Sequence, residues 1–186
     1  MKEIKRCHWC GKDDLYIKYH DEEWGKEVHD DKIFFEFLVL ESAQAGLSWI
    51  TILRKRENYK GLFADFDVEK VAVFTDVEIE LILLDPGIIR NRLKVKSAVK
   101  NAQLFLEIQK EFGSFNNYLY AFMPNNKPIK NNFKNSRDTP STSEISDAIA
   151  KDMKKRGFKF FGSTICYAFM QAVGMLNDHA LDCEFR

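Results

Sequence analysis

The chain has 186 residues and no formal net charge, and 45% of its residues are hydrophobic and 30% charged. This length and composition suit a single soluble globular domain, and no apolar run approaches the ~20 residues that span a bilayer. The first ten residues lack the apolar stretch of a signal peptide, so we expect neither a membrane-spanning nor a secreted protein but a soluble, cytoplasmic one.

The first third of the chain predicts two helices separated by a glycine. Asp30 and Asp31 can cap a helix that runs from Lys32 to about Ala45, where Gly46 interrupts it. A second helix is predicted from Ser48 to Tyr59. We therefore expect a short connection between two helices around Gly46.

Capping-box patterns mark the starts of later helices. They are Thr75-Asp76-Val77-Glu78 and Ser141-Thr142-Ser143-Glu144. With the apolar patterns that follow, the remaining helices are predicted over about residues 75–84, 90–112, 141–156 and 163–176. No segment alternates apolar and polar residues long enough for a sheet, and residues 123–142 are predicted to form a long loop. The expected fold class is all-α.

Glu41 is the most unusual residue of the first predicted helix. It lies three, four and seven positions after Leu38, Phe37 and Phe34, so it shares their apolar face. A carboxylate on a buried face is costly unless it is paired, and its pKa tends to rise. Two interpretations stay open: a structural carboxylate hydrogen-bonded within the core, or an acceptor for a cationic or amino-bearing ligand.

Aromatic residues with polar groups are available to accompany Glu41. Trp9, Tyr16, Tyr19 and Trp24 crowd the N-terminal segment, and Trp49 follows Glu41 by about two turns. Any one of them alone is most simply explained as core packing. Several of them beside a buried carboxylate would suit a flat, electron-poor ring, because ring faces stack and a cation gains from their quadrupoles.

The turn after residue 84 is a second candidate site. The run Leu83-Leu84-Asp85-Pro86-Gly87-Ile88-Ile89-Arg90-Asn91-Arg92 is typical of a helix-hairpin-helix, here over about residues 77–100. Glycine in such a turn lets the backbone approach a phosphate, and the amides at the next helix start can donate to it. The pattern favours binding of a DNA backbone, with candidate contacts at Gly87, Ile88, Arg90 and Arg92.

Two groups of basic residues carry a weaker signal, because most such groups are solvated helix faces. They form a phosphate-binding surface only where another feature indicates a backbone ligand. The Pro-Gly turn supplies such a feature for the first group. The groups are Arg90, Arg92, Lys94, Lys96 and Lys100, and then Lys151, Lys154, Lys155, Arg156 and Lys159.

The cysteines and histidines lie only near the two ends of the chain. All eight fall within the first 29 or the last 21 residues. Since structural zinc takes four thiolate or imidazole ligands, this distribution suggests a metal that joins the ends, and scattered residues without a metal are the alternative. His179 and Cys183 could share one helical turn, with Cys7 and His20 completing the set. Cys7 also begins a Cys-x-x-Cys with Cys10, which fits a redox pair or half of a zinc site.

A series of blocks along nearly the whole chain matches one known family. The blocks are Arg6-Cys7, Leu15-Tyr16-Ile17, Tyr19–Gly25, Leu40-Glu41, Ala45–Thr51, Lys55–Tyr59, Gly87–Arg90, Lys155–Phe160 and Asn177-Asp178-His179. In this order they resemble the 3-methyladenine DNA glycosylases of the TAG family, in the helix-hairpin-helix glycosylase superfamily. So many blocks in order make the resemblance highly specific.

The resemblance implies a fold and a metal. It implies a single glycosylase unit over residues 1–186, with a zinc-binding lobe formed from residues 1–30 and 143–186. The family's zinc ligands fall on Cys7, His20, His179 and Cys183. One structural Zn²⁺ would then act as a clasp between the N- and C-terminal segments, because four protein ligands leave no open position for an activated water.

The resemblance also implies the site residues. Glu41 is expected to be the catalytic residue and to accept hydrogen bonds from the base. Gly46 and Leu47 correspond to the residues that insert into the DNA stack. The substrate-binding positions are Tyr16, Tyr19 and Trp49, with Trp9 nearby.

The activity implied by the resemblance is base excision repair. The enzyme would flip a damaged nucleotide out of double-stranded DNA and hydrolytically excise N3-methyladenine, together with N3-methylguanine, leaving an abasic site. Alkylation at N3 makes the base a good leaving group. Other superfamily members carry an aspartate beyond the hairpin, which members of this family lack; here Asn101 follows the hairpin, and the next acidic residue is Glu107. No lysine is placed for a lyase step, so the enzyme is expected to be monofunctional. The resemblance also implies a monomer that acts at the bacterial nucleoid.

Three rival functions fit the sequence less well. A non-enzymatic helix-hairpin-helix DNA-binding module would leave Glu41 and the aromatic residues unexplained. A glycosylase for oxidised or mismatched bases commonly carries a four-cysteine iron–sulfur cluster or a lysine–aspartate pair, and neither pattern is evident. A zinc hydrolase is disfavoured because four committed ligands close the metal site.

Overall fold

The computed structural model describes residues 4–186, so the first three residues of the predicted 1–30 segment lie outside the described part. Within the described part the chain forms ten α-helices and one pair of two-residue strands, which confirms the all-α class. The helices are α1 (Asp14–Glu22), α2 (Asp31–Gln44), α3 (Trp49–Leu53), α4 (Arg56–Leu62), α5 (Val68–Ala72), α6 (Asp76–Leu84), α7 (Arg92–Phe112), α8 (Phe115–Tyr120), α9 (Glu144–Arg156) and α10 (Ser163–Ala172). The strands are β1 (Ile129–Lys130) and β2 (Leu176–Asn177), which pair in parallel.

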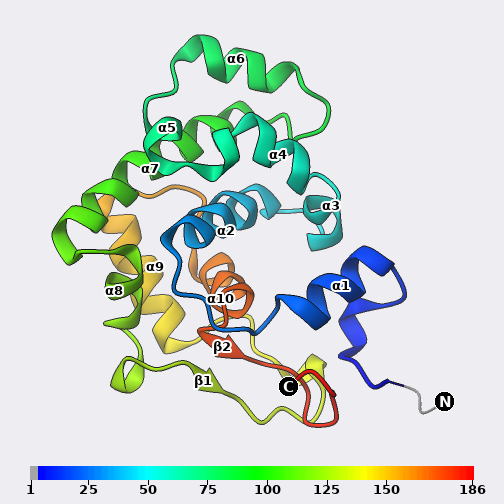
Figure 1. The fold of residues 1–186 in the computed structure, drawn as a ribbon. Coiled ribbons are helices and arrows are strands. Elements are labelled where there is room, and N and C mark those ends of the chain that lie inside the picture. Colours follow the sequence, from blue (N-terminus) through cyan, green and yellow to red (C-terminus); the bar gives the residue numbers. More distant parts are fainter. Residues whose placement is uncertain (1–3) are drawn as a thin grey trace.

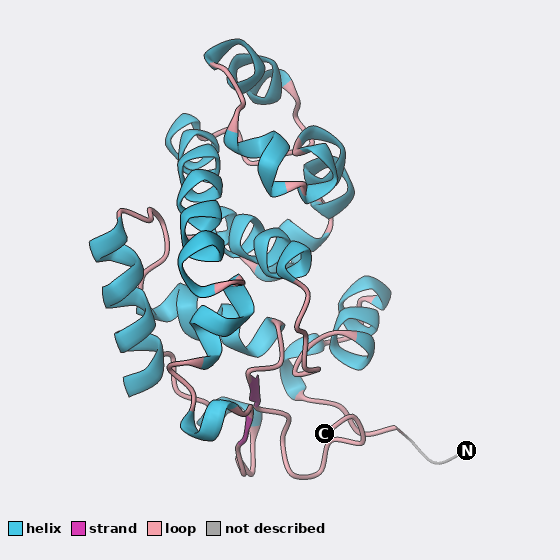
Figure 2. Cartoon of the chain, turned by 60° about the vertical axis from the view of Figure 1, so that its left-hand side comes forward, coloured by secondary structure: helices cyan, strands magenta, loops and turns pink. Residues whose placement is uncertain are grey.

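Helix α2 runs through the centre of the fold. Most of its surface is apolar, so other helices can cover it on several sides. The fully buried side chains include Phe34, Phe35, Leu38 and Leu40. Its neighbours include α3, α7, α8 and α10. Helices α4, α5 and α6 lie above α2, whereas α10 and the strands lie below it (Figures 1 and 2). Glu41, in the buried part of α2, is therefore held away from solvent, whereas Lys32 at the start of the helix is exposed.

The two ends of the chain meet on one side of the molecule. The amide of Glu184 donates to the carbonyl of Lys5 at 3.0 Å, and the N- and C-terminal segments lie close together at the lower right of Figure 1. No helix of the described residues has both the length and the apolar character needed to cross a bilayer. The fold thus brings four of the eight cysteines and histidines together: Cys7, His20, His179 and Cys183.

The predicted helices around the Pro-Gly turn are confirmed. Thr75 and Glu78 form the reciprocal capping box that opens α6. Asn91 caps α7 by accepting from the amides of Leu93 and Lys94, and α7 ends at Gly113 in the left-handed conformation. The longest helix of the described residues therefore begins directly at the turn.

The single helix expected from Ser48 to Tyr59 is wrong, because the structure divides this stretch into α3 and α4. The amide of Lys55 bonds to the carbonyl of Ile52 at 2.9 Å, three residues back, which tightens and ends α3. The side chain of Arg56 then turns inward to pair with Glu23 and Glu36. Ion pairs with distant residues thus change the direction of the chain at a point where helical propensity alone predicts that the helix continues.

Two predicted boundaries of the C-terminal helices are also corrected. The capping box of α9 uses Ser143 and Ser146, two residues later than the expected Ser141 and Glu144. Helix α10 stops at Ala172 because its last carbonyls accept from the amides of the N-terminal segment 25–28. Gly174 then adopts φ +70°, and a Cβ there would lie 2.1 Å from the Lys26 backbone.

The stretch 123–142 is a long connection, as expected, but it has structure of its own. Its strand β1 pairs with β2, although no sequence alternation predicts a sheet. Ser136–Asp138 then forms a short 3-10 turn, in which the Asp138 carboxylate accepts from the Asn135 amide at 3.1 Å. This connection carries side chains to the mouth of the pocket described next.

Candidate active site and metal centre

A pocket of about 260 Å³ opens between the N-terminal segment, α2 and α10. It contains all five residues predicted for the base pocket, which confirms that they come together in space. It also contains residues that were not assigned from the sequence. The lining residues are Trp9, Tyr16, Tyr19, Trp24, Glu41, Gln44, Trp49, Ser136, Thr139, Ala168 and Gln171.

Glu41 brings an unsatisfied carboxyl group into this pocket. Its side chain is 2% exposed, and its Oε2 atom has no hydrogen-bond partner among residues 4–186. Burial raises the pKa of Glu41 from its ordinary value of 4.5 to about 8. A core carboxyl that stabilised the fold would be hydrogen-bonded, so this group is arranged for a ligand that the chain itself does not supply.

The aromatic side chains form the walls of the pocket. The ring centroids of Trp9 and Tyr16 lie 5.0 Å apart, and those of Tyr19 and Trp49 lie 5.4 Å apart. The indole N–H groups of Trp9 and Trp49 have no acceptor in the described chain. Burial, and then the nearby Glu41, raise the pKa of Tyr19, so its phenol stays protonated. The pocket therefore combines stacking surfaces with unpaired donors and one carboxyl group.

The connection between α2 and α3 places Gly46 and Leu47 beside the pocket. Gly46 adopts φ +82°, and Leu47 is 41% exposed although it is a large apolar residue. The ammonium group of Lys94 donates to the carbonyls of Ala43 and Ala45 at 2.9 and 2.7 Å. Lys94, which the sequence placed in a basic phosphate-binding group, is thus committed to holding the end of α2.

The turn between α6 and α7 is packed on its inner side. A Cβ on Gly87 would lie 1.9 Å from the Asn58 side chain, and the Gly87 amide already donates to Asp85 at 2.6 Å. Ile88 was predicted as a DNA contact, but its side chain is buried, so only its backbone could reach a ligand. Arg90 is exposed, whereas Arg92 forms an ion pair with Glu80 of α6.

Cys7, His20, His179 and Cys183 form a buried cluster. Their four ligand atoms all lie within 4.8 Å of one another. The Cys183 sulfur lies 3.3 Å from His179 Nδ1 and 3.5 Å from His20 Nε2, and the Cys7 sulfur lies 3.6 Å from His179 Nδ1. A tetrahedral zinc ion with bonds of about 2.0–2.3 Å would separate its ligand atoms by roughly 3.3–3.8 Å. The cluster has the residue types and spacing for such an ion.

The partners of the two histidines orient them for metal binding. His20 Nδ1 lies 2.7 Å from the Asp21 carboxylate, and His179 Nε2 lies 2.9 Å from the Trp24 carbonyl. Each acceptor takes an N–H, so the lone pair of the other ring nitrogen faces the thiols. Burial lowers the pKa of His179 to about 4 and raises that of Cys7 to about 12. The imidazoles are neutral as ligands must be, and a thiolate here requires a cation.

The structure separates the other terminal residues from this cluster. Cys10 donates its thiol hydrogen to the Cys7 carbonyl at 3.2 Å, and His8 contacts Arg137 at 3.1 Å on the surface. His179 and Cys183 approach through a tight turn in which the Cys183 amide bonds to the Ala180 carbonyl, so the expected helical turn is wrong. Their four-residue spacing still places both side chains on one side.

Several pocket residues were missed from the sequence. Gln44 lies one turn after Glu41 on α2, a spacing that could have indicated it. Trp24 was noted among the aromatic residues but given no role. Ser136 and Thr139 come from the 123–142 connection, and Ala168 and Gln171 come from α10. No local pattern marks these four, because only the tertiary fold brings them to the pocket.

The pH dependence of stability tests the environment of Glu41. The folded chain holds the Glu41 proton up to about pH 8, whereas the unfolded chain releases it near 4.5. Stability is therefore lost as pH rises between these values, by at most about 1.4 kcal/mol per pH unit relative to a neutral side chain. Urea unfolding of the ligand-free Glu41→Gln variant should show a smaller decline from pH 5 to 8 than the wild type. Parallel declines would contradict the burial of an unpaired carboxyl.

Comparison with known proteins gives consistent matches over nearly the whole chain. Residues 9–186 match a family described as methyladenine glycosylase. The chain is 46% identical over 178 residues to DNA-3-methyladenine glycosylase of Haemophilus influenzae, covering 96% of each chain. It is 44% identical over 180 residues to DNA-3-methyladenine glycosylase 1 of Escherichia coli, covering 97% of this chain and 96% of the relative. The fold is similar to that of a Tyr-to-Phe variant of 3-methyladenine DNA glycosylase I (TAG), solved in complex with 3-methyladenine, with a TM-score of 0.94. The two sequences are 36% identical, and the match covers 98% of this chain and 97% of the other.

Proposed function

This chain belongs to the methyladenine glycosylase family, and we infer that it is a DNA-3-methyladenine glycosylase that excises 3-methyladenine in DNA repair. The observation that assigns this activity to the pocket is the buried Oε2 atom of Glu41, which has no hydrogen-bond partner among the described residues and lies among aromatic rings. A flat base with an exocyclic amino group supplies the donor that this carboxyl lacks. Glu41 is thus the catalytic residue of the proposal.

We propose that the pocket holds the damaged base after the nucleotide flips out of double-stranded DNA. Methylation at N3 makes adenine cationic, so its bond to deoxyribose is already weak and needs little acid catalysis. The rings of Tyr16, Tyr19 and Trp49 favour a cation through their quadrupoles, and ionised Glu41 compensates its charge. Normal adenine is neutral, so it gains neither the attraction of the aromatic rings for a cation nor the charge compensation by Glu41. This difference gives selectivity for the alkylated base.

The connection at Gly46 and Leu47 and the turn at Gly87 are proposed to contact the duplex. Leu47 is exposed beside the pocket and can fill the gap that the flipped nucleotide leaves. The amides of Ile88 and Arg90 have no acceptor among the described residues and can donate to a phosphate. We assign this role to backbone amides and exposed Arg90, because Arg92 is already paired with Glu80.

We propose a monofunctional reaction that leaves an intact abasic site. A lyase step needs an amine that attacks the sugar, and the residues that line the pocket include no lysine. Asn101 lies elsewhere, bonded to the backbone of Lys159. We propose that the enzyme acts as a monomer.

Cys7, His20, His179 and Cys183 are proposed to hold one structural Zn²⁺. Support comes from their separations and from the imidazole lone pairs directed toward the thiols. Zinc bound by four protein ligands supplies stability and no activated water. The clasp would fix the N-terminal segment that carries Trp9, Tyr16 and Tyr19 to the pocket.

A base-release assay tests the function. Methylated duplex DNA is incubated with the chain, and the released bases are identified by chromatography and mass spectrometry. We expect 3-methyladenine as the main product, a smaller release of 3-methylguanine and uncleaved abasic strands. Binding to DNA without any base release would indicate a non-enzymatic binding module, and release of oxidised bases only would indicate another class of glycosylase.

A further inference from the structure

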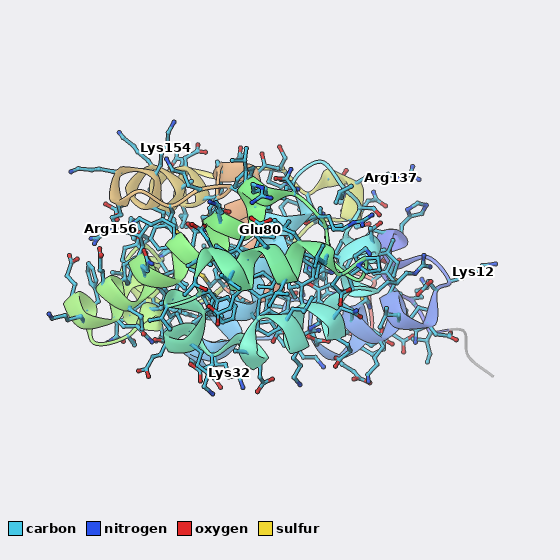
Figure 3. The ribbon with its side chains drawn as sticks, turned by 90° about the horizontal axis from the view of Figure 1, so that it is seen from above. Lys12, Lys32, Glu80, Arg137, Lys154 and Arg156 are labelled. Atoms are coloured by element: carbon cyan, nitrogen blue, oxygen red, sulfur yellow. The ribbon has the colours of Figure 1, made fainter. Side chains whose placement is uncertain are left out.

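The turn between α9 and α10 carries a basic groove that the proposed active site does not use. The groove has a volume of about 590 Å³, and its lining contains Lys151, Lys154, Lys159 and Phe160 but no acidic residue. Arg156 of the same helix is instead held by Glu111 and Asp152. Lys154 extends away from the protein in Figure 3. The three ammonium groups are therefore available to an external anion.

A buried asparagine fixes this groove to the helix that starts at the Pro-Gly turn. Asn101 of α7 is 1% exposed and binds the Lys159 backbone twice, donating to its carbonyl and accepting from its amide, both at 3.0 Å. Nine residues separate Arg92 from Asn101, which corresponds to about 13.5 Å along a helix. The groove and the turn are thus rigidly spaced on one element.

The loop of the groove is held in a conformation that exposes an aromatic ring. Phe160 has φ +54° and is 37% exposed, whereas its neighbours Phe158 and Phe161 are buried. Bulky residues rarely adopt a positive φ, and the two hydrogen bonds between Asn101 and the Lys159 backbone hold the preceding residue in place. An apolar ring at the rim of a cationic groove can contact deoxyribose while the lysines contact phosphate.

The groove lies on the same edge of the molecule as the 123–142 connection, which contributes Ser136 and Thr139 to the pocket. In Figure 3, Lys154 and Arg137 lie along the same edge, and Lys32 lies on the opposite one. Arg137 follows Ser136, which lines the base pocket. A duplex laid along this edge would therefore meet the groove on one side of the pocket.

We propose that the groove of Lys151, Lys154 and Lys159 binds backbone phosphates of duplex DNA several base pairs from the flipped nucleotide. This inference rests on the proposed function, because it takes the base pocket as the site of the flipped nucleotide. Along a strand that follows α7, the 13.5 Å between the Pro-Gly turn and the groove corresponds to roughly four base pairs between their phosphate contacts, at about 3.4 Å per phosphate. Phosphate contacts in the groove would lengthen the stretch of DNA that the protein covers, and they would not distinguish between base sequences.

Salt dependence of DNA binding tests the groove. The Lys154→Gln/Lys159→Gln variant is compared with Lys32→Gln/Lys60→Gln, which removes the same charge around Asp65 on the other edge. The ligand is a duplex of about 20 base pairs with a tetrahydrofuran abasic analogue. Each lost phosphate contact lowers the slope of log K against log salt by about 0.9, so the groove variant should lose nearly two and bind about tenfold more weakly.

The outcomes separate this inference from the proposed function. Three outcomes would contradict phosphate binding by the groove. They are an unchanged salt slope in the groove variant, an equal loss of slope in the control variant, and no DNA binding by the wild type. Lys154→Arg/Lys159→Arg should keep the wild-type slope. Free 3-methyladenine binding, followed by tryptophan fluorescence, should be equal in all variants, since the pocket is untouched. Failure of the wild type to bind or release the base would instead contradict the proposed function, whatever the salt slopes show.

Discussion

Replacing Glu41 with glutamine is expected to slow the release of 3-methyladenine from duplex DNA by about a hundredfold or more. The amide keeps the shape of the side chain but cannot carry the negative charge that compensates a cationic base. Loss of one preorganised electrostatic partner in a dry site typically costs about 10²–10³ in rate. Single-turnover base release on one defined alkylated duplex measures the effect.

Glu36 of the same helix provides the matched control for Glu41. It lies on the opposite side of α2, where it pairs with Arg56, outside the pocket lining. Glu36→Gln should retain base release within about twofold after correction for any change in stability. Equal loss in both variants would mean that Glu41 acts through the fold and not on the base.

Replacing Cys183 with serine is expected to remove zinc and a large part of the stability. Without the ion, buried thiols and imidazoles face one another with no compensation, because all four ligand side chains are nearly inaccessible to solvent. Structural zinc contributes about 10–16 kcal/mol in isolated zinc-finger peptides. Here α2, α7 and α10, which form much of the buried core, carry none of the four ligands. We therefore expect a fall in Tm on the order of 10 °C and a chain that stays folded.

Cys10→Ser is the control for the zinc site, since Cys10 is equally buried but lies outside the cluster. Metal analysis should give about one zinc per chain in the wild type and Cys10→Ser, and almost none in Cys183→Ser. Retention of zinc by Cys183→Ser with its loss from Cys10→Ser would move the site to the other thiolate. Absence of zinc from all three proteins would refute the clasp.

The elements that sequence patterns predicted well are those with local signals. The capping box at Thr75 and Glu78 opens α6 as expected, and the apolar face shared by Phe34, Phe37 and Glu41 is buried. Helix α1 was missed although Asp13 caps it, because nine residues of mixed polarity give little periodicity. Local rules therefore predicted the helices with a clear apolar pattern, including the nine-residue α6, and missed α1, α5 and α8.

Contacts between distant segments explain most of the remaining differences. The early end of α10 depends on amides of residues 25–28, and Lys94 changes from a candidate phosphate ligand to a cap of α2. Ser136 and Thr139 reach the pocket only through the fold of the 123–142 connection. No pattern within a short window contains these relations, whereas family resemblance placed Glu41 and the aromatic residues directly.

The most direct test of the account is the titration of Glu41 itself, with and without base. In ¹³C NMR of the labelled side chain, the free protein should titrate near a pKa of about 8, because burial without a partner disfavours the charged form. Saturating 3-methyladenine should lower that pKa by at least one unit, because the base donates hydrogen bonds to the carboxylate. An ordinary pKa that stays unchanged when the base is added would contradict Glu41 as the group that recognises it.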